Sequence, residues 1–154
     1  MGVSTNGIIA FGVVCEEDCK FPWDEECDGG IDEWWKKERG FADIHHPWTP
    51  DGNYAPGWTE NDPRFREYYD HRTKWRAKNP VPIELENYCS GGSPMYAITV
   101  PGVGLLCWRG DPKTFDPTAL VVTDEQVAAL MEFLKRYEIK YIGEPSWLLM
   151  SYWG

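Results

Sequence analysis

The residues with the clearest ligand spacing lie between Asp24 and Asp32, in the segment DEECDGGID. Taken as an EF-hand calcium loop, this segment places carboxylates at the first, third, fifth and ninth positions and glycine at the sixth. The four carboxylates belong to Asp24, Glu26, Asp28 and Asp32. The twelfth position should carry a bidentate glutamate and is Trp35, so a solvated acidic turn is favoured over a calcium site.

Cysteine is the second residue type that could do chemistry. Five cysteines in a chain without an N-terminal export signal are an odd number, which predicts reduced thiols. Cys15, Cys19 and Cys27 with His45 or His46 have the ligand types of a zinc site. Their spacing fits no compact zinc knuckle or ribbon, so ordinary thiols are favoured.

A third candidate surrounds Cys89. The run Tyr88-Cys89-Ser90-Gly91 is similar to the nucleophile segment of the NlpC/P60 cysteine peptidases, in which Cys-Ser-Gly opens a helix. Here Pro94 and a strand-like run follow Cys89. All the histidines precede Cys89, whereas that family places its histidine downstream. A glycine-rich loop between strands is therefore favoured over the peptidase interpretation.

The same loop has amides of the kind that cradle a phosphate. They belong to Ser90, Gly91, Gly92 and Ser93. With Arg72 and Arg76 from a basic aromatic helix, these residues form the nucleotide-binding alternative, although no Walker-type lysine follows the loop.

The net charge of −10 is concentrated in one part of the chain. Residues 16–33, the acidic segment, carry nine carboxylates against Lys20 alone, a local charge of −8. Residues 64–78 carry a local charge of +4. The negative field repels nucleic acid and anionic membranes and favours encounter with a basic protein surface. Pairing between the acidic segment and residues 64–78 within the same molecule is the simpler alternative.

Hydrophobic and turn patterns predict an α+β fold, with a mostly antiparallel sheet of about five strands packed by two longer helices and one short helix. The expected strand segments are 7–15, 81–88, 95–100, 103–108, 139–142 and 147–153. Pro101-Gly102 suits the centre of a type II turn, which predicts a hairpin between 95–100 and 103–108.

Three segments predict helices. Residues 31–38 form the short helix, with Gly40 as its stop signal. Asn61-Asp62-Pro63 opens a helix over 64–78, and the capping box from Thr123 to Gln126 opens the third helix. Residues 41–60 form an irregular loop region rich in proline, glycine and tryptophan, and residues 1–154 form a single domain. No stretch has the roughly 18 apolar residues of a membrane span.

Six motifs resemble a family of small acidic proteins encoded by tailed bacteriophages. They are SxNGIIAFGV, FPWD, IDEWW, CSGGSPMYAITVPG, RGDPKTFDP and SYWG, and they cover nearly the whole chain. The resemblance implies a phage accessory protein in the host cytoplasm. Inhibitors of host defence, including anti-CRISPR proteins, are a common class among such proteins. The resemblance carries no catalytic residue.

The resulting hypothesis is a non-enzymatic inhibitor without cofactor, which binds a basic, nucleic-acid-handling surface of a host defence complex. It binds no membrane and no nucleic acid directly, and a homodimer is left open. The predicted partner-binding residues are Glu16, Glu17, Asp18, Asp24, Glu25, Glu26, Asp28, Asp32, Glu33, Trp34 and Trp35. Some of Trp34, Trp35, Trp58 and Trp153 are expected to be exposed. The alternatives are a nucleotide-sequestering protein and a calcium-dependent adaptor.

Overall fold

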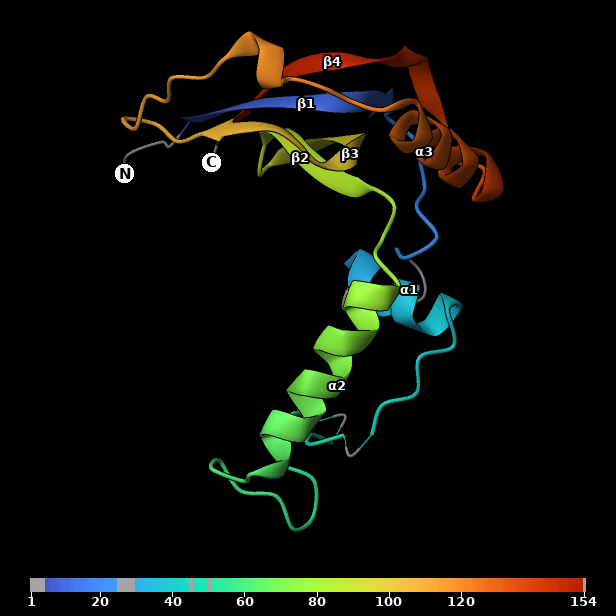
Figure 1. Cartoon of the computed structure of the whole chain (residues 1–154), viewed down its shortest axis with the longest axis vertical. Coiled ribbons are helices and arrows are strands. Elements are labelled where there is room, and N and C mark those ends of the chain that lie inside the picture. The colour runs from blue at the N-terminus through green and yellow to red at the C-terminus, as the bar shows by residue number, and fades with distance from the viewer. Residues whose placement is uncertain (1–4, 25–29, 45, 50, 154) are drawn as a thin grey trace. The chain divides into compact units, whose positions relative to one another are not determined.

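The computed structural model (Figure 1) describes residues 5–24, 30–44, 46–49 and 51–153. In this part of the chain it shows an α+β fold with a mixed four-stranded sheet and three α-helices. The chain divides into two compact units. Unit 1 comprises residues 1–22 and 82–154, and unit 2 comprises residues 23–81.

Unit 1 is built on a closed sheet with the strand order β1-β3-β2-β4. Its strands are β1 (Thr5–Cys15), β2 (Glu84–Ser90), β3 (Ser93–Cys107) and β4 (Tyr141–Trp153). β1 runs antiparallel to both β3 and β4, and β2 runs antiparallel to β3. The sheet closes where β2 meets β4 in parallel, through the pairs Cys89 with Tyr152 and Ser90 with Trp153. This parallel contact makes the sheet mixed.

The prediction of about five strands is corrected to four, because two expected turns lie inside continuous strands. Residues 95–100 and 103–108 do not form a hairpin. Both belong to β3 and pair with the same partner, β1, with a register shift between Ala10 and Gly12. Gly102 does take the expected positive φ, at 66°. Likewise β4 continues through Gly143, with a register shift against β1. Pairing with β1 outweighs the local turn signals, which produce bulges.

Two glycines allow the strands to approach closely at these irregular places. A Cβ atom at Gly12 would collide with the Ile98 carbonyl oxygen, and one at Gly104 would collide with the Ile9 carbonyl oxygen. Gly104 also has a φ of 135°, which L-residues rarely adopt. Glycine is therefore required at both positions.

One face of the sheet forms the core of unit 1. Ile8 and Ala10 of β1 face Ala97 and Met150 there, and all four side chains are buried. Tyr88, Leu148 and Tyr152 pack around them. The third helix, α3 (Asp124–Arg136), begins with the predicted capping box between Thr123 and Gln126, which is confirmed.

Unit 2 has two helices, α1 (Gly30–Glu38) and α2 (Arg64–Lys78), at the predicted positions. Gly40 follows α1 with a φ of 66°, as expected of a helix stop. The core around α2 is aromatic. Tyr68 is buried and lies 5.9 Å from Trp48, while Phe65 lies 5.0 Å from Trp58, between ring centroids. The segment 41–60 thus supplies rings to this core.

Candidate functional site

The acidic segment is used in two different ways along its length. In its first part, Glu17, Asp18 and Asp24 are exposed and Glu16 is half-buried. Asp18 lies 3.4 Å from Lys140 in a pair that is open to solvent. The predicted partner-binding residues Glu25, Glu26 and Asp28 lie outside the described residues. The first part therefore offers carboxylates to solvent.

The last part of the acidic segment contacts α2. Arg72 Nη2 lies 2.7 Å from Glu33 Oε1, and Arg76 Nη2 lies 3.3 Å from Asp32 Oδ2. The simpler alternative from the charge pattern, pairing between the acidic segment and the basic helix, is therefore confirmed for these two carboxylates.

Glu33 is the centre of a charged network. Lys36 is buried, and its ammonium group also contacts Glu33 Oε1. Arg72 donates to the hydroxyl group of Tyr68 and lies 3.9 Å from Asp43. Burial, and then the charges of Asp43 and Glu33, raise the pKa of Tyr68 to about 12. Two cations thus face two carboxylates around a neutral phenol, an arrangement that fixes side chains in place.

Trp34 and Trp35 belong to the core of unit 2. Only 4% of Trp34 and 3% of Trp35 is exposed. Trp34 packs 5.5 Å from Trp23 between ring centroids, and Trp35 Nε1 donates to the Asn79 carbonyl oxygen at 3.1 Å. Trp35 thereby links α1 to the C-terminal end of α2, and both rings present little surface to a partner. Trp58 is also buried, whereas Trp153 is 56% exposed, as expected of some of these tryptophans.

The calcium candidate lies only partly within the described residues. Asp24 is exposed and Asp32 is engaged by Arg76, while Glu26 and Asp28 lie outside the described residues. Among the residues that the structure describes, no three His, Cys, Asp or Glu side chains gather as metal ligands would.

The nucleotide candidate set lies in two different units. Ser90, Gly91, Gly92 and Ser93 form the turn between β2 and β3 in unit 1. Within this turn the Ser93 amide donates to Ser90 Oγ at 3.1 Å, and the Gly91 amide donates to the Trp153 carbonyl oxygen at 3.4 Å. The two arginines of this set, Arg72 and Arg76, lie in unit 2 and are held by carboxylates.

The described cysteines are free thiols. Cys15 is buried on β1, and burial, followed by the neighbouring Cys19, raises its pKa to about 12. Cys89 is exposed, with a φ of 75° at the end of β2. At neutral pH Cys15 is protonated and is a poor nucleophile or metal ligand. Cys27 and His45 of the zinc candidate lie outside the described residues.

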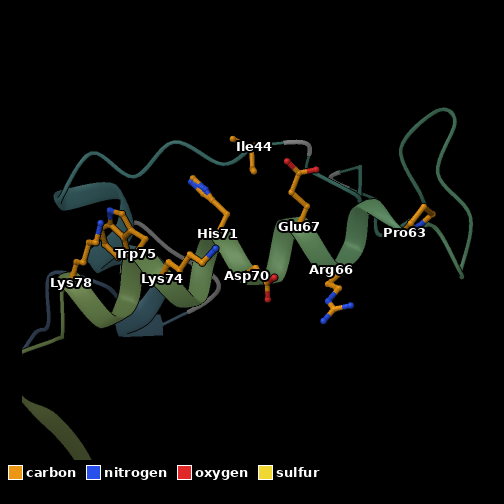
Figure 2. A pocket seen from close by; sticks show the side chains of 9 residues that line it. All are labelled: Ile44, Pro63, Arg66, Glu67, Asp70, His71, Lys74, Trp75 and Lys78. Carbon is orange, nitrogen blue, oxygen red and sulfur yellow. The ribbon is translucent and has the colours of Figure 1, made fainter.

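A groove of about 660 Å³ follows one face of α2 (Figure 2). Its residues along the helix are Pro63, Arg66, Glu67, Asp70, His71, Lys74, Trp75 and Lys78, and Ile44 lies on the facing segment. Phe41 supports two of the rings, since its centroid lies 4.9 Å from Trp75 and 5.1 Å from His71. The sequence pattern predicted the basic helix but did not indicate this groove.

The face of the sheet opposite the unit 1 core carries exposed apolar side chains. On β4, Leu149 is 83%, Trp153 56% and Trp147 37% exposed. Leu149 pairs with Ile9 across the strands, and the Trp147 ring lies 5.4 Å from Phe11. The signal was present in the sequence, because Trp147–Trp153 is apolar at both alternating sets of positions except at Ser151, and a strand can bury only one set in a one-sided core.

No family model, curated protein or solved structure matches this chain. None of the described helices is long and apolar enough to cross a membrane.

Proposed function

We propose that this protein is a non-enzymatic inhibitor of a bacterial defence complex, and that it acts by binding a protein surface. The observation that carries the proposal is the exposed apolar face of β4, formed by Trp147, Leu149 and Trp153. Contiguous exposed apolar side chains are typical of protein-binding sites, and tryptophan is enriched among the residues that dominate binding energy.

The exposed carboxylates of the acidic segment support a basic partner. Glu17, Asp18 and Asp24 are open to solvent, and the chain has a net charge of −10. Carboxylates compete with phosphate for lysine and arginine surfaces and speed encounter with them. The likeness to small acidic phage proteins supports a nucleic-acid-handling defence complex, such as a CRISPR–Cas effector, as the class of target.

The test is phage plaquing on bacteria that carry an active CRISPR–Cas system and express this chain. We expect the wild-type chain to restore plaquing and Leu149→Asp to lose most of that effect, because a charge at the centre of an apolar contact is costly to bury. Ile142→Asp is the matched control, since Ile142 is an exposed apolar residue of β4 beyond the bulge, at 61% exposure.

Two results would contradict the proposal. If the wild-type chain left plaquing unchanged across a panel of nucleic-acid-handling defence systems, the inhibitor function would be wrong. If Leu149→Asp retained full inhibition, the β4 face would not be the contact surface.

A further inference from the structure

The charged residues of the α2 groove form a stripe with an acidic half and a basic half. Glu67, Asp70, Lys74 and Lys78 follow one another at spacings of three or four residues, so they share one helix face. All four side chains are exposed. None of them makes an ion pair with any residue that the structure describes. We call these four residues the charged stripe.

The charged stripe is acidic at one end and basic at the other, so two copies of it are complementary in charge when they lie antiparallel. A second α2 helix laid antiparallel across the groove, about a twofold axis between Asp70 and Lys74, brings Asp70 opposite Lys74 and Glu67 within one residue of the level of Lys78. Each carboxylate then meets an ammonium group, and the twofold axis repeats both pairs. A uniformly charged ligand, such as a nucleic acid or an acidic peptide, would meet repulsion in one half of the stripe.

The groove also has the length and the apolar surface that a helix needs. From Pro63 to Lys78 the helix rises about 22 Å at 1.5 Å per residue. Ile44, Trp75 and Pro63 supply apolar surface along it. Arg66 lies about 120° round the helix from Lys78, so it flanks the stripe rather than facing the partner's Lys78. We propose that this groove is the interface of a homodimer in which two α2 helices pack antiparallel.

The contact is small compared with a stable interface, which buries about 1,200–2,000 Å² in total. We therefore expect a reversible dimer whose fraction rises with protein concentration and falls with added salt, because exposed ion pairs are screened. The proposal is independent of the inhibitor function, which uses the β4 face.

The test is sedimentation velocity of charge-reversed variants over a range of protein concentrations. We expect the wild-type chain to reach about twice its monomer mass of 17.8 kDa. We expect E67K/D70K and K74E/K78E each to remain monomeric, because every facing pair then carries like charges. An equimolar mixture of the two variants should form a heterodimer, since one stripe is then wholly basic and the other wholly acidic.

Three controls separate this interface from others. The quadruple variant E67K/D70K/K74E/K78E keeps the self-complementary pattern and should dimerise like the wild type. E132K/E144K changes the net charge as much as E67K/D70K does, at exposed positions of unit 1, and should leave the dimer unchanged. Leu149→Asp should also leave it unchanged, because the β4 face is not involved.

A wild-type chain that stays monomeric at every concentration would overturn the proposal. So would a dimer that persists in both double variants, or a mixture of these variants that forms no heterodimer. Because all four substituted side chains are exposed, circular dichroism should show the same helix content in every variant. A double variant that lost helix content would be replaced by its neutral counterpart, E67Q/D70N or K74Q/K78Q, which removes the attraction between facing pairs and should also weaken the dimer.

Discussion

The positive charges of α2 lie on two faces that are used differently. Arg64, Arg72 and Arg76 each hold a carboxylate within unit 2, at 2.5, 2.7 and 3.3 Å. Arg66, Lys74 and Lys78 make no ion pair with any described residue. The planar guanidinium group suits carboxylates held in a fixed geometry, whereas a lysine ammonium group is strongly hydrated. The first face therefore holds unit 2 together, and the second is left for a partner.

The largest effect should come from the ring at the centre of the first face. Tyr68 is 1% exposed, whereas its neighbour Tyr69 is 52% exposed. We expect Tyr68→Ala to lower the free energy of unfolding by about 4 kcal/mol, the cost of removing a buried aromatic ring. Tyr69→Ala should cost about 1 kcal/mol or less. Urea unfolding followed by tryptophan fluorescence measures both, and equal losses would contradict the assignment of Tyr68 to the core.

The next largest effect should come from Glu33. Glu33→Ala leaves the ammonium group of Lys36 buried without its carboxylate, and Arg72 loses its nearest carboxylate. Removing one member of a buried ion pair costs about 3–5 kcal/mol. Because 44% of the Glu33 side chain is exposed, we expect a loss of about 2 kcal/mol.

Lys36→Met in the Glu33→Ala background should recover part of that stability, since it removes the buried charge and keeps an apolar stem. If Glu33→Ala were as stable as the wild type in urea unfolding, the network would contribute nothing.

A smaller effect should depend on pH through Asp62. Hydrogen bonds from the Arg64 side chain, and then from its backbone amide, lower the pKa of Asp62 from 3.8 to about 2. Because this pKa is lower in the folded state, the ionised carboxylate stabilises the fold above about pH 4, and this contribution is lost as the pH falls through about 2.

We therefore expect Asp62→Asn to be less stable than the wild type above about pH 4. The difference between their free energies of unfolding should shrink as the pH falls through about 2. Titration of the Asp62 carboxyl carbon by NMR gives the pKa directly, and a value near 3.8 would show that Arg64 does not hold it.

The smallest effect should come from the second face. Lys74→Ala and Lys78→Ala remove exposed side chains without ion pairs to described residues, so we expect changes in the free energy of unfolding within about 0.5 kcal/mol. A loss comparable to that of Glu33→Ala would mean that these lysines stabilise the fold of the single chain.

Local signals made the helices predictable. The Thr123–Gln126 capping box, the Asp62-Pro63 start and Gly40 each act within a few residues, and each marks a helix end in the structure. The number of strands was not predictable in this way. Pro101-Gly102 and Gly143 carry turn signals, but pairing with β1 continues on both sides of them. Long-range pairing decides strand continuity, and sequence patterns report it poorly.

The candidate surfaces were predictable only in part. The polarity of charge along the chain indicated that the acidic segment and α2 attract one another, and two ion pairs join them. The burial of Lys36, Trp34 and Trp35 was not predictable, because helix spacing alone does not say which side of α1 meets α2. The groove depends on Ile44, which is far from α2 in the sequence.

The acidic segment neutralises two of the three arginines on the first face of α2, since Glu33 holds Arg72 and Asp32 holds Arg76. A double-mutant cycle with Glu33→Gln, Arg72→Gln and both together tests this claim most directly, with urea unfolding at a concentration where the chain is monomeric. Asp70→Asn with Lys74→Gln is the matched control. We predict a coupling energy of about 1 kcal/mol or more for Glu33 with Arg72, and of a few tenths of a kcal/mol at most for the control. Equal and negligible coupling in both cycles would contradict the claim.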